Sequence, residues 1–120
     1  KEMSLGEYAG FIKTSLKLKD VRVYGDLNMP VKRAAVCTGS GKSMISDALA
    51  AGADVYVTGD IDHHSGIDAL QAGLAVIDAG HYGTEYIFMD AMKKRIQEVF
   101  DGLKVTCAKV QCPYTLMADM

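Results

Sequence analysis

A repeated unit in the middle of the chain constrains the fold more than any other feature. The segment A-L-A-A-G-A-D-V-Y-V at residues 48–57 returns as A-L-Q-A-G-L-A-V-I-D at residues 69–78, a shift of 21 residues. Each copy has the pattern of a helix end, a C-cap glycine and an apolar strand. Strands joined by helices over so short a distance lie parallel and are connected by right-handed crossovers. The repeat therefore predicts a parallel sheet with helices packed against it.

A glycine follows each of three predicted strands within two or three residues. The strands span residues 34–37, 55–57 and 75–77, and the glycines are Gly39, Gly59 and Gly80. Because the carboxyl ends of parallel strands meet at one edge of a sheet, we expect all three turns along that edge. Open α/β sheets bind their ligands there. These three turns are the places to look for a functional site.

The region before the repeat has the pattern of a helix and two strands. S-L-G-E at residues 4–7 is a capping box, and apolar residues at helical spacing then predict a helix that ends near Leu18. Residues 21–24 and 31–37 predict two strands. The loop between them ends in Pro30, which we expect to remain outside any ladder. So short a connection predicts that the two strands form an antiparallel pair.

Two further elements are predicted after Gly80. Residues 84–100 form a helix whose apolar side chains should face the core, namely Phe88, Met92, Ile96, Val99 and Phe100. Residues 103–110 predict a final strand, with Cys107 in the core. The fold class is therefore α/β, with a mixed, mostly parallel sheet in an α-β-(βα)3 type repeat followed by a final strand. We expect one domain over residues 1–112 and a carboxyl-terminal tail over residues 113–120.

Composition removes several classes of function. With 120 residues, of which 49% are hydrophobic, the chain can bury the core of one domain. A formal net charge of -2 gives no broad attraction to nucleic acid or to an anionic membrane. The sequence has no apolar run of 18 residues, so we expect no membrane-spanning helix, and we expect no signal peptide. Its three cysteines fit neither a disulfide framework nor a zinc knuckle, so we expect a reducing cytoplasm.

The first glycine turn, T-G-S-G-K-S at residues 38–43, is similar to a phosphate-binding loop but lacks its full pattern. A Walker A motif requires a glycine where this chain has Val36. What remains is either an ordinary helix start or a turn whose free amides hold a phosphate, with Lys42 adding positive charge. Cys37, just before this turn, is a small buried residue or a nucleophile; the first reading is favoured because no base is close in sequence.

The second and third turns contain the side chains that could bind a metal or take part in acid/base catalysis. T-G-D-I-D-H-H at residues 58–64 gathers two carboxylates and two imidazoles, although Asp60 is also a good N-cap for the next helix. In V-I-D-A-G-H-Y-G-T-E at residues 76–85, a strand leads into a helix that begins near His81. His81 and Glu85 then project from one face, as two ligands of a metal or as an acid/base pair. The alternative is a plain helix start, where the helix dipole favours Glu85.

These motifs together resemble a known family. T-G-D-I-D-H-H-S-G-I-D-A, V-I-D-A-G-H-Y-G-T-E and V-C-T-G-S-G-K-S are similar to the carboxyl-terminal signature of the Nif-three-like dinuclear metal-centre family, also named GTP cyclohydrolase 1 type 2 homologues. The resemblance runs from the first helix to Val110. It implies two intertwined repeats, of which this chain covers the second. The chain also begins at Lys1 rather than at a methionine, so we expect it to be part of a longer protein.

The resemblance also implies a site and an assembly. Members of the family hold two divalent metal ions, zinc, manganese or iron, in a cleft between the repeats, and form hexameric rings. His81 and Glu85 match the ligands from the second repeat, and His64 matches a histidine near the cleft. The other ligands, a histidine pair and an aspartate, belong to the first repeat, and His63 with His64 does not match that pair. Tight metal binding by this chain alone is therefore not expected.

Two functional hypotheses follow. The first is a metal-dependent hydrolase that acts on a nucleotide or another phosphate-bearing small molecule, in which His64 moves a proton. The second is a homo-oligomeric assembly or regulatory module that binds metal without catalysis. Turnover by the full-length protein with and without metal distinguishes the two.

Overall fold

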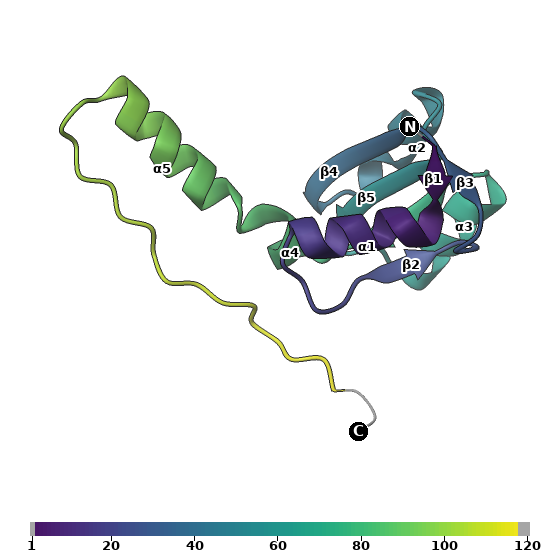
Figure 1. Ribbon diagram of the computed structural model, residues 1–120. Coiled ribbons are helices and arrows are strands. Elements are labelled where there is room, and N and C mark those ends of the chain that lie inside the picture. Colours follow the sequence, from purple (N-terminus) through teal and green to yellow (C-terminus); the bar gives the residue numbers. More distant parts are fainter. Residues whose placement is uncertain (1, 118–120) are drawn as a thin grey trace. The chain divides into compact units, whose positions relative to one another are not determined.

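The computed structural model describes residues 2–117, which divide into two compact units (Figure 1). The first unit ends at Glu85 and the second begins at Tyr86. In chain order the first unit contains β1 (Met3–Ser4), α1 (Leu5–Ser15), β2 (Arg22–Tyr24), β3 (Pro30–Val31), β4 (Ala34–Ser40), the 3-10 helix η1 (Lys42–Met44), α2 (Ile45–Ala50), β5 (Val55–Gly59), α3 (His63–Gln71), β6 (Ala75–Asp78) and α4 (His81–Glu85). The second unit contains α5 (Phe88–Val99).

The main sheet has four strands in the order β2-β6-β5-β4. β4, β5 and β6 are parallel neighbours, with Val55 opposite Ala75 and Val57 opposite Ile77. β2 runs antiparallel along the outer side of β6, and β1 pairs with β3 in a separate two-stranded ladder. The predicted class, a mixed and mostly parallel α/β sheet, is confirmed.

Helices cover both faces of this sheet (Figure 1). β5 is buried along its whole length and alternates between the two cores. Val55 and Val57 pack with residues of α1, whereas Tyr56 packs with residues of α2 and α3. A strand with helices on both faces needs apolar residues at every position, which is why the repeat appears as a continuous apolar run.

The capping box at the start of α1 is present as predicted. The Glu7 amide donates to Ser4 Oγ at 3.1 Å, and the Ser4 amide donates to Glu7 Oε1 at 3.1 Å. The helix ends earlier than predicted, at Ser15 rather than near Leu18. Lys17 has a φ of 55°, in the left-handed region, so the chain leaves the helix there.

The predicted antiparallel pair of residues 21–24 with residues 31–37 is wrong. β2 is antiparallel, but its partner is β6, and β4 lies at the opposite edge of the sheet. Pro30, which we expected outside any ladder, lies opposite Ser4 in β3. The carboxylate of Asp54 then accepts from the amides of residues 32 and 33 at 2.8 and 2.9 Å. These contacts divide the predicted strand in two, and β4 begins after them.

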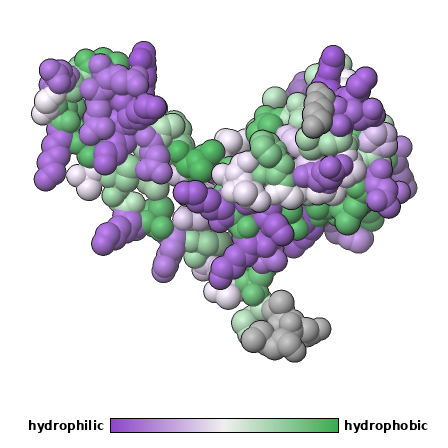
Figure 2. Space-filling view, viewed as in Figure 1, coloured by the Kyte–Doolittle hydropathy of each residue, from purple (hydrophilic) through white to green (hydrophobic). Residues whose placement is uncertain are grey.

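The predicted helix over residues 84–100 is also divided, into α4 and α5, and α5 has no buried residue within the described chain. Phe88 is 60% exposed and Val99 is 53% exposed, so the predicted inward face is not a core face here. Figure 2 shows hydrophobic residues beside hydrophilic ones on the surface of this segment. Residues 103–110 form no strand. Periodicity identifies the apolar face of a helix, but not what packs against it.

Candidate metal-binding site

The three glycine turns meet at one edge of the sheet, as predicted. A Cβ atom on Gly59 would lie 2.6 Å from the carbonyl carbon of Gly80, 2.7 Å from the oxygen of Gly39 and 2.7 Å from the amide nitrogen of His81. Gly39 and Gly80 have φ of 72° and 83°, which favour glycine. Only a residue without a side chain allows the turns after β4, β5 and β6 to approach this closely.

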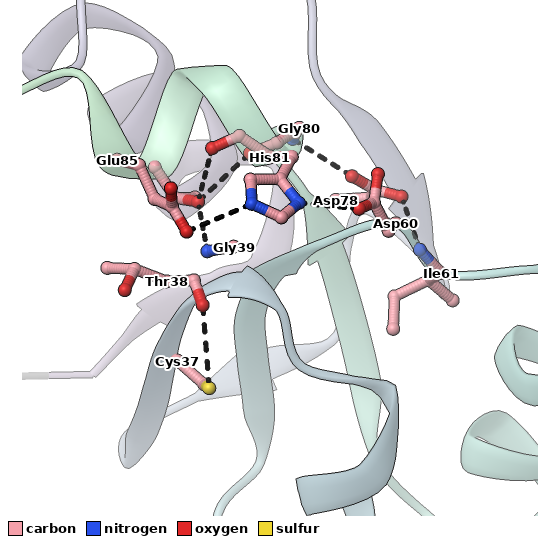
Figure 3. Close-up of polar contacts among 10 residues, drawn as sticks. Cys37, Thr38, Gly39, Asp60, Ile61, Asp78, Gly80, His81 and Glu85 are labelled. Carbon is pink, nitrogen blue, oxygen red and sulfur yellow. Dashed lines mark hydrogen bonds and ion pairs between the residues drawn. The ribbon is translucent and has the colours of Figure 1, made fainter.

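Asp78, the last residue of β6, ties the second turn to the third. Its Oδ1 accepts from the Gly80 amide at 2.9 Å, and its Oδ2 accepts from the Ile61 amide at 2.9 Å (Figure 3). Both bonds satisfy amides that leave the strands and have no ladder partner. One carboxylate therefore fixes the residues just before His81 against those just after Gly59.

Thr84 ties the first turn to α4. Its side chain is buried, and its Oγ1 accepts from the Gly39 amide at 2.8 Å while lying 3.0 Å from the Gly80 oxygen. The hydroxyl thus joins the end of β4 to the start of α4. This side chain holds the five-residue helix on the edge of the sheet.

His81 lies between two carboxylates. Its Nδ1 is 2.7 Å from Oδ2 of Asp60, and its Nε2 is 3.0 Å from Oε1 of Glu85 (Figure 3). About half of each side chain is exposed: 51%, 53% and 50% for His81, Asp60 and Glu85. The hydrogen bond with Asp60 is the main reason that the pKa of His81 is raised, and the charge of Glu85 adds to it.

Asp60 is not the N-cap of α3. The cap is Asp62, whose Oδ1 accepts from the Ser65 amide at 2.8 Å. Lys42, considered above for phosphate binding, lies 2.8 Å from Oδ2 of Asp62, and this contact lowers the pKa of the carboxyl. The ion pair of Lys42 with Asp62 thus joins the residues after the first turn to those after the second.

The two histidines of the second turn lie in the first turn of α3. The rings of His63 and His64 meet edge to face, with centroids 5.3 Å apart, and both side chains are exposed. Within residues 2–117 no hydrogen bond or ion pair joins His64 to His81 or Glu85. The structure brings His81 and Glu85 together, with His64 on a neighbouring turn.

The cysteines are not part of this arrangement. Cys37 is half-buried on the edge strand β4, beside the core that contains Tyr56. Cys107 is half-buried rather than in a strand core, and its Sγ lies 3.6 Å from the Met89 oxygen. The interpretation of Cys107 as a core strand residue is wrong because residues 103–110 form no strand.

Sequence reasoning missed two residues of the edge, Asp78 and Thr84, and left a third open. Asp60 was included in a cluster of carboxylates and imidazoles, with an N-cap as the alternative. Asp78 could have been found from the sequence, because a carboxylate at the end of an otherwise apolar strand needs hydrogen-bond donors nearby. Thr84 carries no comparable signal, since threonine in a helix is usually unremarkable.

His81 and Glu85 provide donor atoms of the kinds that metal ions bind. An imidazole nitrogen and a carboxylate oxygen suit zinc, manganese and iron. Across the described residues 2–117, no three histidine, cysteine or acidic side chains converge on one point. The reason is geometric: Asp60 and Glu85 lie against opposite nitrogens of the His81 ring. His81 and Glu85 therefore fit a metal as two ligands of an incomplete set.

Comparison with known proteins identifies the family. The Duf34/NIF3 (NGG1p interacting factor 3) family model matches residues 1–113. The chain belongs to the Duf34/NIF3 family. Two curated relatives, both named GTP cyclohydrolase 1 type 2 homolog, support this. The protein from Clostridium perfringens is 37% identical over 85% of this chain, and that from Bacillus subtilis is 41% identical over 86%.

Solved structures of the Duf34/NIF3 family share the fold. A Staphylococcus aureus protein, described as hypothetical, has a TM-score of 0.91 at 34% identity and covers 98% of this chain. A Bacillus cereus protein related to NIF3 has a TM-score of 0.79 at 42% identity and covers 82%. The chain spans only 39% and 27% of the two curated relatives, and 40% and 27% of these two structures. No helix in residues 2–117 has the length and apolar character to cross a membrane.

Proposed function

We propose that His81 and Glu85 are two ligands of a divalent metal site whose other ligands lie outside this chain. One observation carries the proposal: Nε2 of His81 and Oε1 of Glu85 lie 3.0 Å apart, half exposed, on a helix that three converging turns hold in place. Two side chains with metal-binding atoms so close can share one ion. The short length of the chain relative to its relatives supports the idea that the missing ligands lie in another segment.

The proposed use of this site is hydrolysis in the longer protein. A bound zinc, manganese or iron ion lowers the pKa of a water and so supplies a nucleophile near neutral pH. This chain's contribution is to hold two ligands and to offer His64 as a proton carrier at the neighbouring turn. The two curated relatives are named GTP cyclohydrolase 1 type 2 homolog, and this name supports the proposal that the longer protein catalyses hydrolysis. In the longer protein, His64→Ala should leave metal bound and reduce hydrolysis by about a hundredfold.

A non-catalytic module is the second candidate, and a specific observation favours it. We call His81 and Glu85 together the half-site. Within residues 2–117, no third metal-binding side chain joins this half-site, and no hydrogen bond links it to His64. A metal bound there would hold parts of an assembly together without supplying a reactive water. Metal-dependent turnover by the longer protein, assayed with and without manganese, zinc or iron, decides between the two candidates.

The ligand proposal can be tested on this chain with manganese and nuclear magnetic resonance. A bound Mn²⁺ ion broadens the signals of nearby amides, so the amides of Gly39, Gly80 and His81 should broaden first. His81→Ala and Glu85→Ala should each abolish this broadening. His63→Ala is the matched control. It removes an exposed histidine at the start of α3 and should leave the broadening of these amides unchanged. Broadening that survives in His81→Ala would contradict the proposal.

We also propose that the protein is a homo-oligomer, with a hexameric ring as the expected form. Exposed apolar side chains at the two ends of α5 support this, since Phe88 at its start and Phe100 at its C-cap are each 60% exposed. Soluble proteins seldom leave such side chains grouped without a partner surface. Sedimentation should detect self-association at micromolar concentration, and Phe88→Asp should weaken it. A monomer under these conditions would contradict the proposal.

A further inference from the structure

Asp60 has a backbone conformation that needs an explanation. Its φ is 56°, in the left-handed region where residues other than glycine are uncommon, although aspartate and asparagine tolerate it best. The neighbours on both sides are fixed: Gly59 packs against Gly80 and the amide of His81, and Ile61 is buried and donates to Asp78. The chain therefore has little freedom at this position. An unfavourable conformation that the surroundings enforce points to a role for the side chain.

Among residues 2–117, the Asp60 side chain has one hydrogen-bond partner, the imidazole of His81. An aspartate before a helix usually serves as its N-cap. In α3 that cap is Asp62, so capping does not explain Asp60. The carboxylate of Asp60 lies 2.7 Å from Nδ1, which is shorter than the 3.0 Å between Nε2 and Glu85. A carboxylate can only accept, so in the neutral ring the closer contact favours a proton on Nδ1.

We propose that Asp60 is a positioning residue that fixes His81 in the Nδ1–H tautomer and so leaves the Nε2 lone pair free on the side of Glu85. The proposal rests on the proposed metal site for its functional meaning, because Nε2 is the atom that would bind the ion there. Histidine ligands commonly donate their other ring N–H to a carboxylate, which fixes the tautomer and the ring orientation. Asp60 supplies that carboxylate from a different turn of the same edge.

The ring nitrogens of His81 give a direct test in the metal-free chain. Their ¹⁵N shifts, measured at a pH where the imidazole is neutral, distinguish a protonated nitrogen from one with a free lone pair. We expect protonated Nδ1 and unprotonated Nε2. In Asp60→Gly, which tolerates the left-handed backbone, Glu85 is the remaining acceptor and the proton should move to Nε2. Asp60→Asn replaces the carboxylate with an amide that can also donate to Nδ1, so the acceptor-only Glu85 should again draw the proton to Nε2.

Any other pattern overturns the proposal. An Nε2–H form in the unaltered chain, or an unchanged Nδ1–H form in Asp60→Gly or in Asp60→Asn, each shows that the carboxylate does not set the tautomer. His63 and His64 are internal controls in the same spectra, since neither contacts Asp60 in a hydrogen bond and both should keep their shifts in the variants.

A zinc titration separates this proposal from the metal site. Asp60→Gly should lower the zinc affinity of the chain by about 10- to 100-fold. If the tautomer changes as expected but the unaltered chain binds no zinc, the metal site fails while the role of Asp60 stands. If zinc binds through His81 but Asp60→Gly changes neither tautomer nor affinity, the metal site stands and the role of Asp60 fails.

Discussion

Gly59→Ala is the perturbation that tests the architecture of the edge most directly. The added Cβ would lie 2.6–2.7 Å from three backbone atoms, whereas ordinary contact begins at 3.4 Å. All three atoms belong to the neighbouring turns, so relief requires those turns to move apart. Overpacking alone costs about 1–3 kcal/mol. Loosening the two hydrogen bonds of Asp78 and the bond from Gly39 to Thr84 adds about 1 kcal/mol for each bond, and we expect a total loss of about 4–6 kcal/mol.

Urea unfolding followed by circular dichroism measures this loss, provided that the slope with urea is unchanged. Gly10→Ala is the matched control. Gly10 lies in α1, and a Cβ there would meet nothing within 4 Å. It should stabilise the chain by about 0.5–1 kcal/mol, since alanine favours a helix. A cost below about 1 kcal/mol for Gly59→Ala would refute the reasoning, because the three turns would then not be packed as tightly as described.

Three further predictions concern single contacts. Thr84→Val keeps the shape but leaves the Gly39 amide without its acceptor, so urea unfolding should show a loss of about 1–3 kcal/mol. Ser4→Ala removes the cap of α1, and the same assay should show a loss of about 1 kcal/mol. Since the pKa of His81 is raised, the stability it contributes is present below the unfolded pKa of about 6.5 and is lost as pH rises through the higher folded pKa. The stability difference between the unaltered chain and His81→Gln should therefore shrink with rising pH, and a growing difference would contradict the assigned contact.

The position of the three glycines at one edge of the sheet could be predicted from the sequence, because each glycine is recognised from the residues next to it. Gly39, Gly59 and Gly80 each follow an apolar run, and parallel pairing alone is enough to bring them together. The spacing of His81 and Glu85 is equally local, since residues four apart on a helix face the same way. The contact of 3.0 Å between them follows from that spacing.

The parts that failed depend on distant partners. β2 pairs with β6, which is distant in sequence, instead of with the next strand. The carboxylate that accepts from residues 32 and 33 likewise belongs to a distant residue, Asp54. The role of Asp60 was hidden in the same way, because Asp60 and Asp62 are both plausible caps in sequence. Only the fold shows that Asp62 takes the cap and that Asp60 faces a histidine 21 residues later.

The half-site is ordered by its surroundings, and this bears on how it would bind metal. α4 has five residues, too few for a helix that persists by itself in water. Asp78 accepts a hydrogen bond from Gly80 just before its start, Thr84 accepts one from Gly39, and the contact with Asp60 holds the His81 ring. Because His81 and Glu85, the two proposed ligands, are already in place, weak metal binding by this chain would reflect the number of ligands rather than the cost of ordering them. Stiffening the turns should therefore gain little affinity, whereas a segment that supplies further ligands should gain much.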